Sequence, residues 1–163
     1  MSKYNKTFPK KGTLSKLALA IMCINTSLST AGPGNYSISD GAADISGIGT
    51  ATTTIDQTGI STADTVVIEW DSFNVSSGES VNFIQDSGDI AINNISATSG
   101  VSDIQGSITA GGTIFLSNTN GFIFGADSVV NTGAFLATTS NIDFDSSKQE
   151  IDLSDNASTG SIE

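Results

Sequence analysis

Short pieces of strand-forming residues are broken at close intervals by glycine and asparagine over most of this chain. The segment 112–134 shows the pattern best, because Thr-Ile-Phe-Leu-Ser and Gly-Phe-Ile-Phe are separated only by an Asn-Thr-Asn run, and Val129 and Val130 follow soon after. β-Branched and aromatic residues in such short runs favour strands, and Asn-Gly or Gly-Gly pairs favour sharp turns. No segment after residue 31 keeps a 3.6-residue apolar period, so the chain is predicted to be all-β.

The predicted strands after residue 64 are short and closely spaced. They are Thr65–Trp70, Ser80–Gln85, Ile90–Ile95, Ser107–Ala110, Thr113–Ser117, Gly121–Phe124, Ser128–Asn131, Ala134–Thr138, Asn141–Phe144 and Glu150–Leu153. Apolar and polar residues alternate inside them, so Val81 and Phe83 are expected to point inward on either side of an outward Asn82. Asparagines at the corners are expected to bond their own backbone or to stack between layers.

Strands this short bury little on their own, but stacked coils of chain would build a continuous core and pair each strand with its neighbours above and below. A β-sandwich would instead need longer strands with turns about every 8 to 12 residues. We therefore predict a right-handed parallel β-helix, with residues 32–63 as an N-terminal β cap. Coils of roughly 20 to 25 residues would give about five or six coils in the segment 32–163.

The segment 1–31 has the organisation of a secretory signal peptide. Five lysines precede an apolar core over residues 17–24, and a polar stretch ends at Ala31. That apolar core is much shorter than the ~20 residues of a membrane-spanning helix, and small residues before the cut are typical of signal cleavage. Cleavage is predicted between Ala31 and Gly32, which leaves residues 32–163 as one domain. Cys23 lies in the leader, so that domain has no disulfide.

The segment 32–163 is strongly acidic, and this excludes several functions. It holds one lysine, all 17 acidic residues and neither arginine nor histidine, so its net charge is 1 − 17 = −16. Nucleic acid is excluded as a partner, because binding its phosphates depends on Lys and Arg. Without His or Cys, the usual catalytic nucleophile pairs and zinc sites are excluded as well. No cofactor or metal site is predicted.

Carboxylate pairs are the one kind of catalytic group that the composition still allows. Asp143 and Asp145 share one face of a predicted strand, and Asp86 and Asp89 flank a predicted turn. Two carboxylates suffice for glycoside hydrolysis, and carboxylate oxygens also bind calcium. In so acidic a chain, however, such pairs are typical of a solvated surface.

Several elements between residues 70 and 121 follow one another in a characteristic order. They are Trp70, Phe73-Asn74-Val75, Gly78-Glu79-Ser80-Val81-Asn82-Phe83-Ile84-Gln85, Ala91-Ile92-Asn93-Asn94-Ile95, Ile104-Gln105-Gly106 and Asn118-Thr119-Asn120-Gly121. Together they resemble the N-terminal secretion (TPS) domain of filamentous-haemagglutinin-type exoproteins of two-partner secretion. Thr119 stands where that family usually has proline, and Asp86 likewise replaces a common proline.

The resemblance implies a β-helical secretion domain without enzymatic activity, recognised by the periplasmic domains of an outer-membrane β-barrel transporter. The exoprotein would then be secreted or held at the bacterial surface, and downstream regions would carry any host or surface ligand. The motif residues expected to serve transporter recognition or the fold are Trp70, Phe73, Asn74, Val81, Phe83, Gln85, Asn118, Asn120 and Gly121. For each of them a purely structural role, in the core or at a corner, is the alternative.

Two other functions stay open at the level of sequence. A stand-alone β-helical adhesin fibre would need a closed C-terminal end. A β-helical enzyme acting on polysaccharide would need a groove with convergent carboxylates. The acidic, serine-rich segment 143–163 shows no capping pattern, and an uncovered last coil is an exposed strand edge. We therefore expect the chain to be part of a larger exoprotein.

Overall fold

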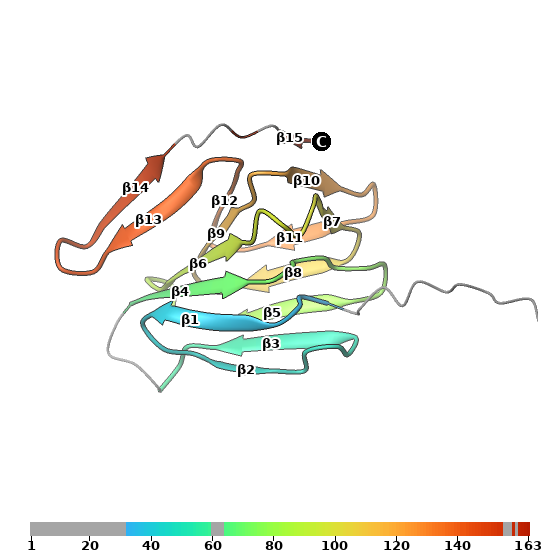
Figure 1. The fold of residues 1–163 in the computed structure, drawn as a ribbon. Coiled ribbons are helices and arrows are strands. Elements are labelled where there is room, and N and C mark those ends of the chain that lie inside the picture. Colours follow the sequence, from blue (N-terminus) through green and yellow to red (C-terminus); the bar gives the residue numbers. More distant parts are fainter. Residues whose placement is uncertain (1–31, 60–63, 155–157, 159) are drawn as a thin grey trace, which may run out of the picture.

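The computed structural model describes residues 32–59, 64–154, 158 and 160–163. Within these ranges every regular element is a β-strand (Figure 1), which confirms the predicted all-β class. No helix in this part of the chain is long and apolar enough to cross a membrane. The predicted leader and its last residue, Ala31, lie outside the described residues.

The strands form three sheets, each built from successive turns of the chain, and one separate hairpin. The first sheet contains, in spatial order, β1 (Tyr36–Asp40), β4 (Thr65–Trp70), β6 (Ile90–Ile95), β9 (Thr113–Ser117) and β12 (Ala134–Thr138). The second contains β2 (Asp44–Ser46), β3 (Thr52–Asp56), β5 (Ser80–Ile84), β8 (Ser107–Ala110) and β11 (Val129–Asn131). The third contains β7 (Ser102–Ile104), β10 (Gly121–Phe124) and β15 (Ser161–Ile162). The hairpin consists of β13 (Asn141–Asp145) and β14 (Glu150–Ser154).

The chain visits the sheets in turn, passing through β5, β6 and β7, then β8, β9 and β10, and then β11 and β12. β7 begins the third sheet, and each of the other strands is parallel to its predecessor in the same sheet. The predicted parallel β-helix is therefore confirmed. Because parallel pairing satisfies the backbone groups of each coil from the coils beside it, no single short strand has to be stable alone.

The predicted number of coils is wrong, since the helix makes about three turns. Thr52, Ser80 and Ser107 stand at the same register position, so the first two turns run over the intervals 52–80 and 80–107, and both are longer than the predicted coil. The next turn is shorter, because Ser107 is followed at this position by Val129. The remaining residues are used for the two ends, where they form a cap and the hairpin.

An N-terminal β cap is also confirmed, but it is shorter than the predicted segment 32–63, because β3 already belongs to the first turn of the helix. β1 is antiparallel to β4, with an irregularity in register between Ile38 and Asp40, and β2 is antiparallel to β3. These two strands therefore occupy the edges that the first turn would otherwise expose (Figure 1). A bulged antiparallel strand at an edge protects a sheet against pairing with other chains.

Alternation along each strand builds the core. Val66, Ile68 and Trp70 of β4 point inward, and the next turns place Ala91 and Ile114 in register with Val66. In β5, Val81 and Phe83 are buried, as predicted, and Ile84 is exposed. The interior is thus a set of apolar columns running along the helix axis, and the hydrophobic effect acts across coils more than within one.

The β13–β14 hairpin leaves the coil and lies beside it, at the upper left of Figure 1. Its buried residue Ile142 packs with Val67 and Ile92, which point outward from the first sheet. The segments predicted as strands at 141–144 and 150–153 are correct as strands, but they pair with each other and do not extend the coil. The hairpin therefore covers an apolar strip that a fully regular β-helix would expose.

Candidate functional site

Trp70 lies in the core at the end of β4, where it is 2% exposed. Its indole Nε1 donates a hydrogen bond of 2.9 Å to Oδ1 of Asn93, which is completely buried one turn further along. Asn93 in turn donates to the carbonyl oxygens of Ala91 and Phe115 at 3.2 Å. A buried indole N–H needs an acceptor, so the asparagine-rich strand supplies the partner of the tryptophan.

The motif Phe-Asn-Val at 73–75 forms the corner after β4. Phe73 is completely buried and meets the ring of Trp70 edge-on, with centroids 5.6 Å apart. Asn74 Oδ1 accepts a hydrogen bond of 2.9 Å from the backbone N–H of Asp103 in the next turn. Val75 forms a parallel bridge with Ile104. This motif therefore fixes one corner of the first turn directly on the corner above it.

Val81 and Phe83 lie in β5, and Gln85 lies at the corner that follows this strand. The two apolar residues are part of the main core. Gln85 is 9% exposed, and its amide Nε2 donates a short hydrogen bond to Oε1 of Gln57, one turn earlier. Gln57 then donates to the carbonyl of Ile90. Stacked glutamines thus connect two successive turns at the point where the second sheet passes into the first.

The Asn-Thr-Asn-Gly run at 118–121 forms a corner that has hydrogen bonds both to the preceding coil and within its own turn. Asn118 is completely buried, and its Nδ2 donates at 2.9 Å to both the carbonyl of Gly100 and Oγ of Ser102. Its Oδ1 accepts from the N–H of Asn120 at 2.9 Å, as expected for an asparagine that bonds its own turn. Gly121 has a φ of 95°, which favours glycine.

Gly32, on the C-terminal side of the predicted cleavage, is buried at the start of the described chain. All predicted motif residues between Trp70 and Gly121 also lie in the core or within corner hydrogen bonds. The structure therefore brings them together as parts of the fold, distributed along the helix, and does not gather them into one exposed patch.

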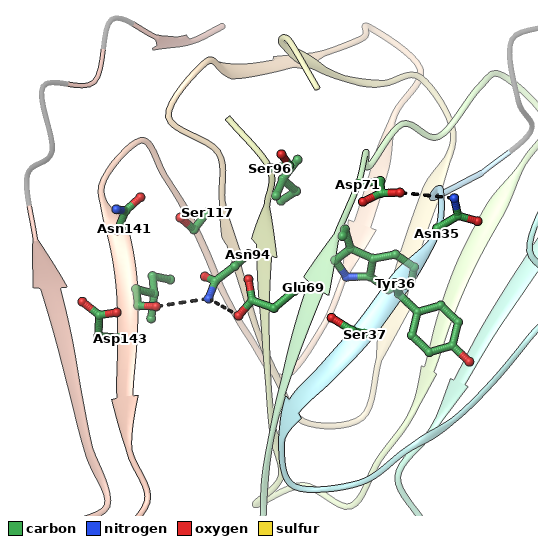
Figure 2. A pocket seen from close by; sticks show the side chains of 13 residues that line it. Asn35, Tyr36, Ser37, Glu69, Asp71, Asn94, Ser96, Ser117, Asn141 and Asp143 are labelled. Carbon is green, nitrogen blue, oxygen red and sulfur yellow. Dashed lines mark hydrogen bonds between the residues drawn. The ribbon is translucent and has the colours of Figure 1, made fainter. Parts of the chain in front are cut away.

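A polar groove, which the sequence alone did not indicate, lies at one end of the first sheet. Its volume is about 650 Å³, and Figure 2 shows side chains from β1, β4, β6, β9 and β13 around it. Asn94 Nδ2 donates to Oε1 of Glu69 at 3.1 Å and to the carbonyl of Ile142 at 3.2 Å, so it ties the hairpin to the helix (Figure 2). Segments that are far apart in the sequence form this groove, and no local pattern marks it.

The carboxylates of the groove are Glu69, Asp71 and Asp143. Glu69 accepts hydrogen bonds from Asn94 and Ser39, and Asp71 accepts one of 3.2 Å from Asn35. These neutral donors use Glu69 and Asp71 as ordinary acceptors. In the part of the chain that the structure describes, no group of three potential ligand side chains could hold a metal ion.

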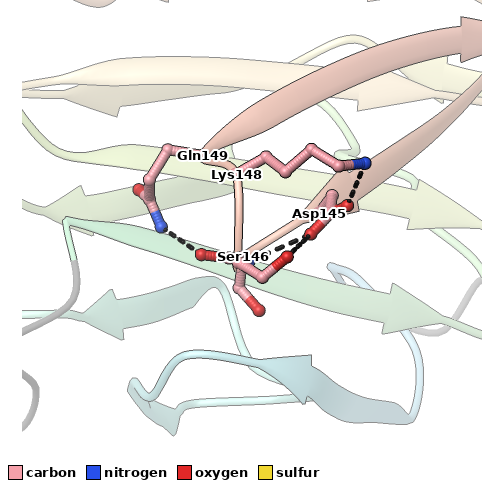
Figure 3. A network of polar contacts seen from close by, with 5 residues as sticks. Asp145, Ser146, Lys148 and Gln149 are labelled. Carbon is pink, nitrogen blue, oxygen red and sulfur yellow. Dashed lines mark hydrogen bonds and ion pairs between the residues drawn. The ribbon is translucent and has the colours of Figure 1, made fainter.

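The other predicted carboxylates take part in turns. Asp89 Oδ2 accepts from the N–H of Asp86 at 2.9 Å. Asp145 forms an ion pair of 2.7 Å with Lys148 and accepts from Ser147 in the turn of the hairpin (Figure 3). The Lys148 and Ser147 hydrogen bonds hold the pKa of Asp145 below its ordinary value. These residues therefore order exposed turns and do not converge on a catalytic centre.

Architecture and site together define a class, namely a parallel β-solenoid domain whose characteristic motifs build its coils. Comparison with known proteins gives the family within that class. The model of the TPS secretion domain matches residues 33–162. The chain belongs to this family of two-partner secretion domains.

Individual relatives agree with this assignment. A heme/hemopexin-binding protein of Haemophilus influenzae strain Rd is 34% identical over 112 residues, which are 68% of this chain and 12% of that protein. A second heme/hemopexin-binding protein of Haemophilus influenzae is 33% identical over 81 residues, or 50% of this chain and 9% of the relative. The crystal structure of the HMW1 secretion domain from Haemophilus influenzae matches with a TM-score of 0.60 and 30% identity, over 69% of this chain and 28% of that one.

These findings confirm the family resemblance inferred from the motifs. The domain is the secretion-targeting domain of an exoprotein of two-partner secretion, a family whose members are secreted across the outer membrane. Its family is one of secretion-targeting and not of catalytic domains. The chain spans about an eighth of the first relative, so the binding named for that relative remains a property of that protein.

Proposed function

We propose that the motif residues of this domain are recognised by the periplasmic domains of the outer-membrane transporter before the β-helix folds. One observation carries this proposal, the burial of the motif series. Trp70, Phe73 and Val81 are no more than 2% exposed, and Asn118 is completely buried. A partner that contacts these side chains must therefore meet them in the unfolded chain.

The composition supports recognition of an extended chain. No charged residue occurs between Asp103 and Asp127, or between Asp127 and Asp143. In the folded domain these stretches supply β8 to β12. Uncharged, strand-prone segments are suited to pairing with an exposed sheet edge of a partner, where backbone hydrogen bonds give the affinity.

The proposed route has three stages. The leader directs the chain into the periplasm, where the motif residues remain accessible to the transporter. Outside the cell, the cap and first turn form, and further coils add to the existing edges, because a stack of coils gains its stability from contacts between neighbours. The motif residues thus have one role before passage and a second role in the finished fold.

A disulfide between two successive turns tests the proposal. Thr52 and Ser80 are paired in register, with their hydroxyl oxygens 3.1 Å apart. Replacing both with cysteine allows a disulfide that holds the folded domain, and the segment 32–163 contains no other cysteine. Binding to the isolated periplasmic domains of the transporter is then measured for the oxidised folded protein and for the reduced protein freshly diluted from urea.

Binding is expected only for the reduced, unfolded chain, and each single-cysteine variant should behave like the unmodified chain. Equal binding of the oxidised folded protein would contradict recognition before folding. The polysaccharide-enzyme alternative gains no support from the groove, since two of its three carboxylates, Glu69 and Asp71, accept hydrogen bonds from neutral side chains.

A further inference from the structure

The first described residue is held by a carboxylate. The backbone nitrogen of Gly32 donates a hydrogen bond of 2.9 Å to Oε2 of Glu79. The same oxygen accepts a hydrogen bond of 2.7 Å from the backbone N–H of Ser76. Glu79 lies in the turn between the Phe-Asn-Val corner and β5, and it is only partly exposed. The start of the cap is thus attached to the first turn of the helix through a single negative charge.

A buried hydroxyl without a partner lies beside the same residue. Thr53 is 0% exposed, and its Oγ1 has no hydrogen-bond partner among the described residues. That oxygen is 2.9 Å from the position where a Cβ on residue 32 would stand. A side chain at residue 32 would therefore meet the hydroxyl, and in the uncut chain, where Gly32 has a φ of +75°, it would add backbone strain. The site therefore accommodates glycine at residue 32, and Thr53 Oγ1 remains available as a hydrogen-bond acceptor.

Among the described residues, the carboxylate of Glu79 has no cationic side chain near it. The segment 32–163 contains one basic residue, Lys148, and that lysine is paired with Asp145 in the turn of the hairpin (Figure 3). A carboxylate that accepts two backbone N–H bonds, next to an orphaned hydroxyl, is suited to a compact cation with several donors.

We propose that this is a binding site for the chain's own α-ammonium group, created when the leader is removed after Ala31. Hydrolysis of the Ala31–Gly32 peptide bond consumes one water and leaves a carboxylate on Ala31 and an ammonium on Gly32. The ammonium keeps the bond to Glu79, adds a full positive charge to it, and has further protons for Thr53 Oγ1. An α-amino group has an ordinary pKa of about 8, so it is charged at neutral pH.

The consequence is a link between processing and folding. Before cleavage, Gly32 offers one N–H and no charge, so the contact with Glu79 is an ordinary hydrogen bond to a carboxylate. After cleavage it becomes an ion pair in a partly buried setting, which is stronger than an exposed one. The cap therefore reaches its full stability only in the processed chain, and the site selects glycine as the first residue after the cut.

The test compares three forms of the whole chain. They are the uncut protein of residues 1–163, the same protein cut between residues 31 and 32, and the cut protein acetylated selectively on its α-amine. Each form is made with the native Glu79, with Glu79→Gln and with the control Glu150→Gln, which removes an exposed carboxylate on β14. Urea unfolding gives the equilibrium constant for each combination.

Acetylation of the cut protein is expected to raise its unfolding constant about tenfold, the scale of one charge-assisted hydrogen bond. Glu79→Gln should reduce this difference to less than about twofold, whereas Glu150→Gln should leave it unchanged. If acetylation has no effect, or if its effect is the same with Glu79→Gln, the site does not bind the ammonium and Glu79 merely holds a turn.

Two further measurements keep the proposal testable if Glu79→Gln does not fold. N-terminal sequencing of the exported protein must give Gly32 as the first residue, and any other first residue overturns the proposal. The α-amine of the native cut protein should react with an acylating reagent at least about tenfold more slowly than in urea, because the ion pair holds it protonated and bonded. Equal rates in the two conditions would also overturn it.

Discussion

The two ends of the β-helix are finished in different ways. At the first turn, β1 and β2 lie antiparallel along the edges of β4 and β3 and close them. At the other end, β11 and β12 are the last members of their sheets among the described residues. The difference shows in the side chains, because Phe73 in the first turn is completely buried whereas Phe135 of β12 is 37% exposed.

From this difference we infer that the local stability of the coils changes along the helix axis and is highest near the capped end. Each coil is supported by its neighbours, so a coil with contacts on both sides is held more firmly than one with contacts on a single side. Of the nine motif residues, Trp70, Phe73 and Asn74 lie in the capped first turn, and the other six are divided equally between the next two turns. The recognition series therefore extends from the capped turn toward the less supported end of the helix. The predictions below test this gradient, and they begin with the largest expected effect.

Phe73→Ala should be the most damaging substitution, with a loss of about 3–5 kcal/mol in the free energy of unfolding, because it leaves a cavity beside Trp70 in a fully packed core. Phe135→Ala should cost less than about 2 kcal/mol, since its ring is partly solvated. Urea denaturation of both variants measures the difference. Similar losses for the two would refute the gradient.

Asn118→Ala should cost about 2–4 kcal/mol, because it removes two donated bonds and leaves the carbonyl of Gly100 and the hydroxyl of Ser102 without their donor. Asn120→Ala should cost about 1 kcal/mol or less, since its bond to the carbonyl of Ala97 is exposed to water. The Tm of each variant, measured by thermal unfolding, distinguishes a buried hydrogen bond between two coils from a hydrogen bond at the surface. Equal changes in Tm would mean that the buried amide has no special role.

Gly121→Ala should destabilise by about 2–3 kcal/mol, since it combines a φ of 95° with a new Cβ that would overlap the carbonyl oxygen of Ser161. Gly78→Ala is the matched control, because it has a φ of 83° but nothing within 4 Å of the new Cβ. That variant should lose only about 1 kcal/mol through backbone strain. If both lose the same amount, the contact between β10 and β15 contributes little.

The smallest effects concern two acidic turns. The pKa of Asp145 is lowered first by Lys148 and then by Ser147, whereas the pKa of Asp56 is lowered by hydrogen bonds from Thr58. A lowered pKa in the folded state means that the carboxylate stabilises the fold above its ordinary pKa of 3.8, and that this contribution is lost as pH falls through the folded value.

Added salt should therefore raise the pKa of Asp145 toward the ordinary value and leave that of Asp56 nearly unchanged, because salt screens exposed ion pairs more than local hydrogen bonds. Lys148→Met should have the same selective effect. Carboxyl chemical shifts followed by NMR between acidic and neutral pH would measure both. A shift of Asp56 as large as that of Asp145 would contradict the assigned causes.

Local pattern was sufficient to predict β4–β6 and β8–β14 and the direction of their side chains, but it missed the short strands β7 and β15 of the third sheet. Val81 and Phe83 point inward because a period of two leaves no other choice for a strand with one buried face. The Asn118–Asn120 bond was likewise expected, since asparagine in a turn bonds the backbone two residues on. The cap was predicted only as a region, residues 32–63, because β1 and β2 contain few β-forming residues, and β3 within that region was not recognised as part of the first turn.

The side-chain contacts between successive coils could not be predicted from the sequence. The pairing of Trp70 with Asn93, and of Gln85 with Gln57, depends on turn lengths that change along the helix and leave no exact repeat. The groove required the return of the hairpin to the first sheet, which strand propensity alone does not distinguish from a further coil. These features are fixed by packing between distant segments.

The central claim is that the motif residues are accessible in the periplasm and buried after export. Because the segment 32–163 lacks cysteine, a single Val81→Cys reports on this directly by its reaction with a maleimide. Ser77→Cys in the exposed turn is the control. We predict that Val81→Cys is labelled in the periplasmic chain and protected in the exported protein, while Ser77→Cys is labelled in both. Protection of Val81→Cys already in the periplasm, in cells that export the protein, would contradict the account.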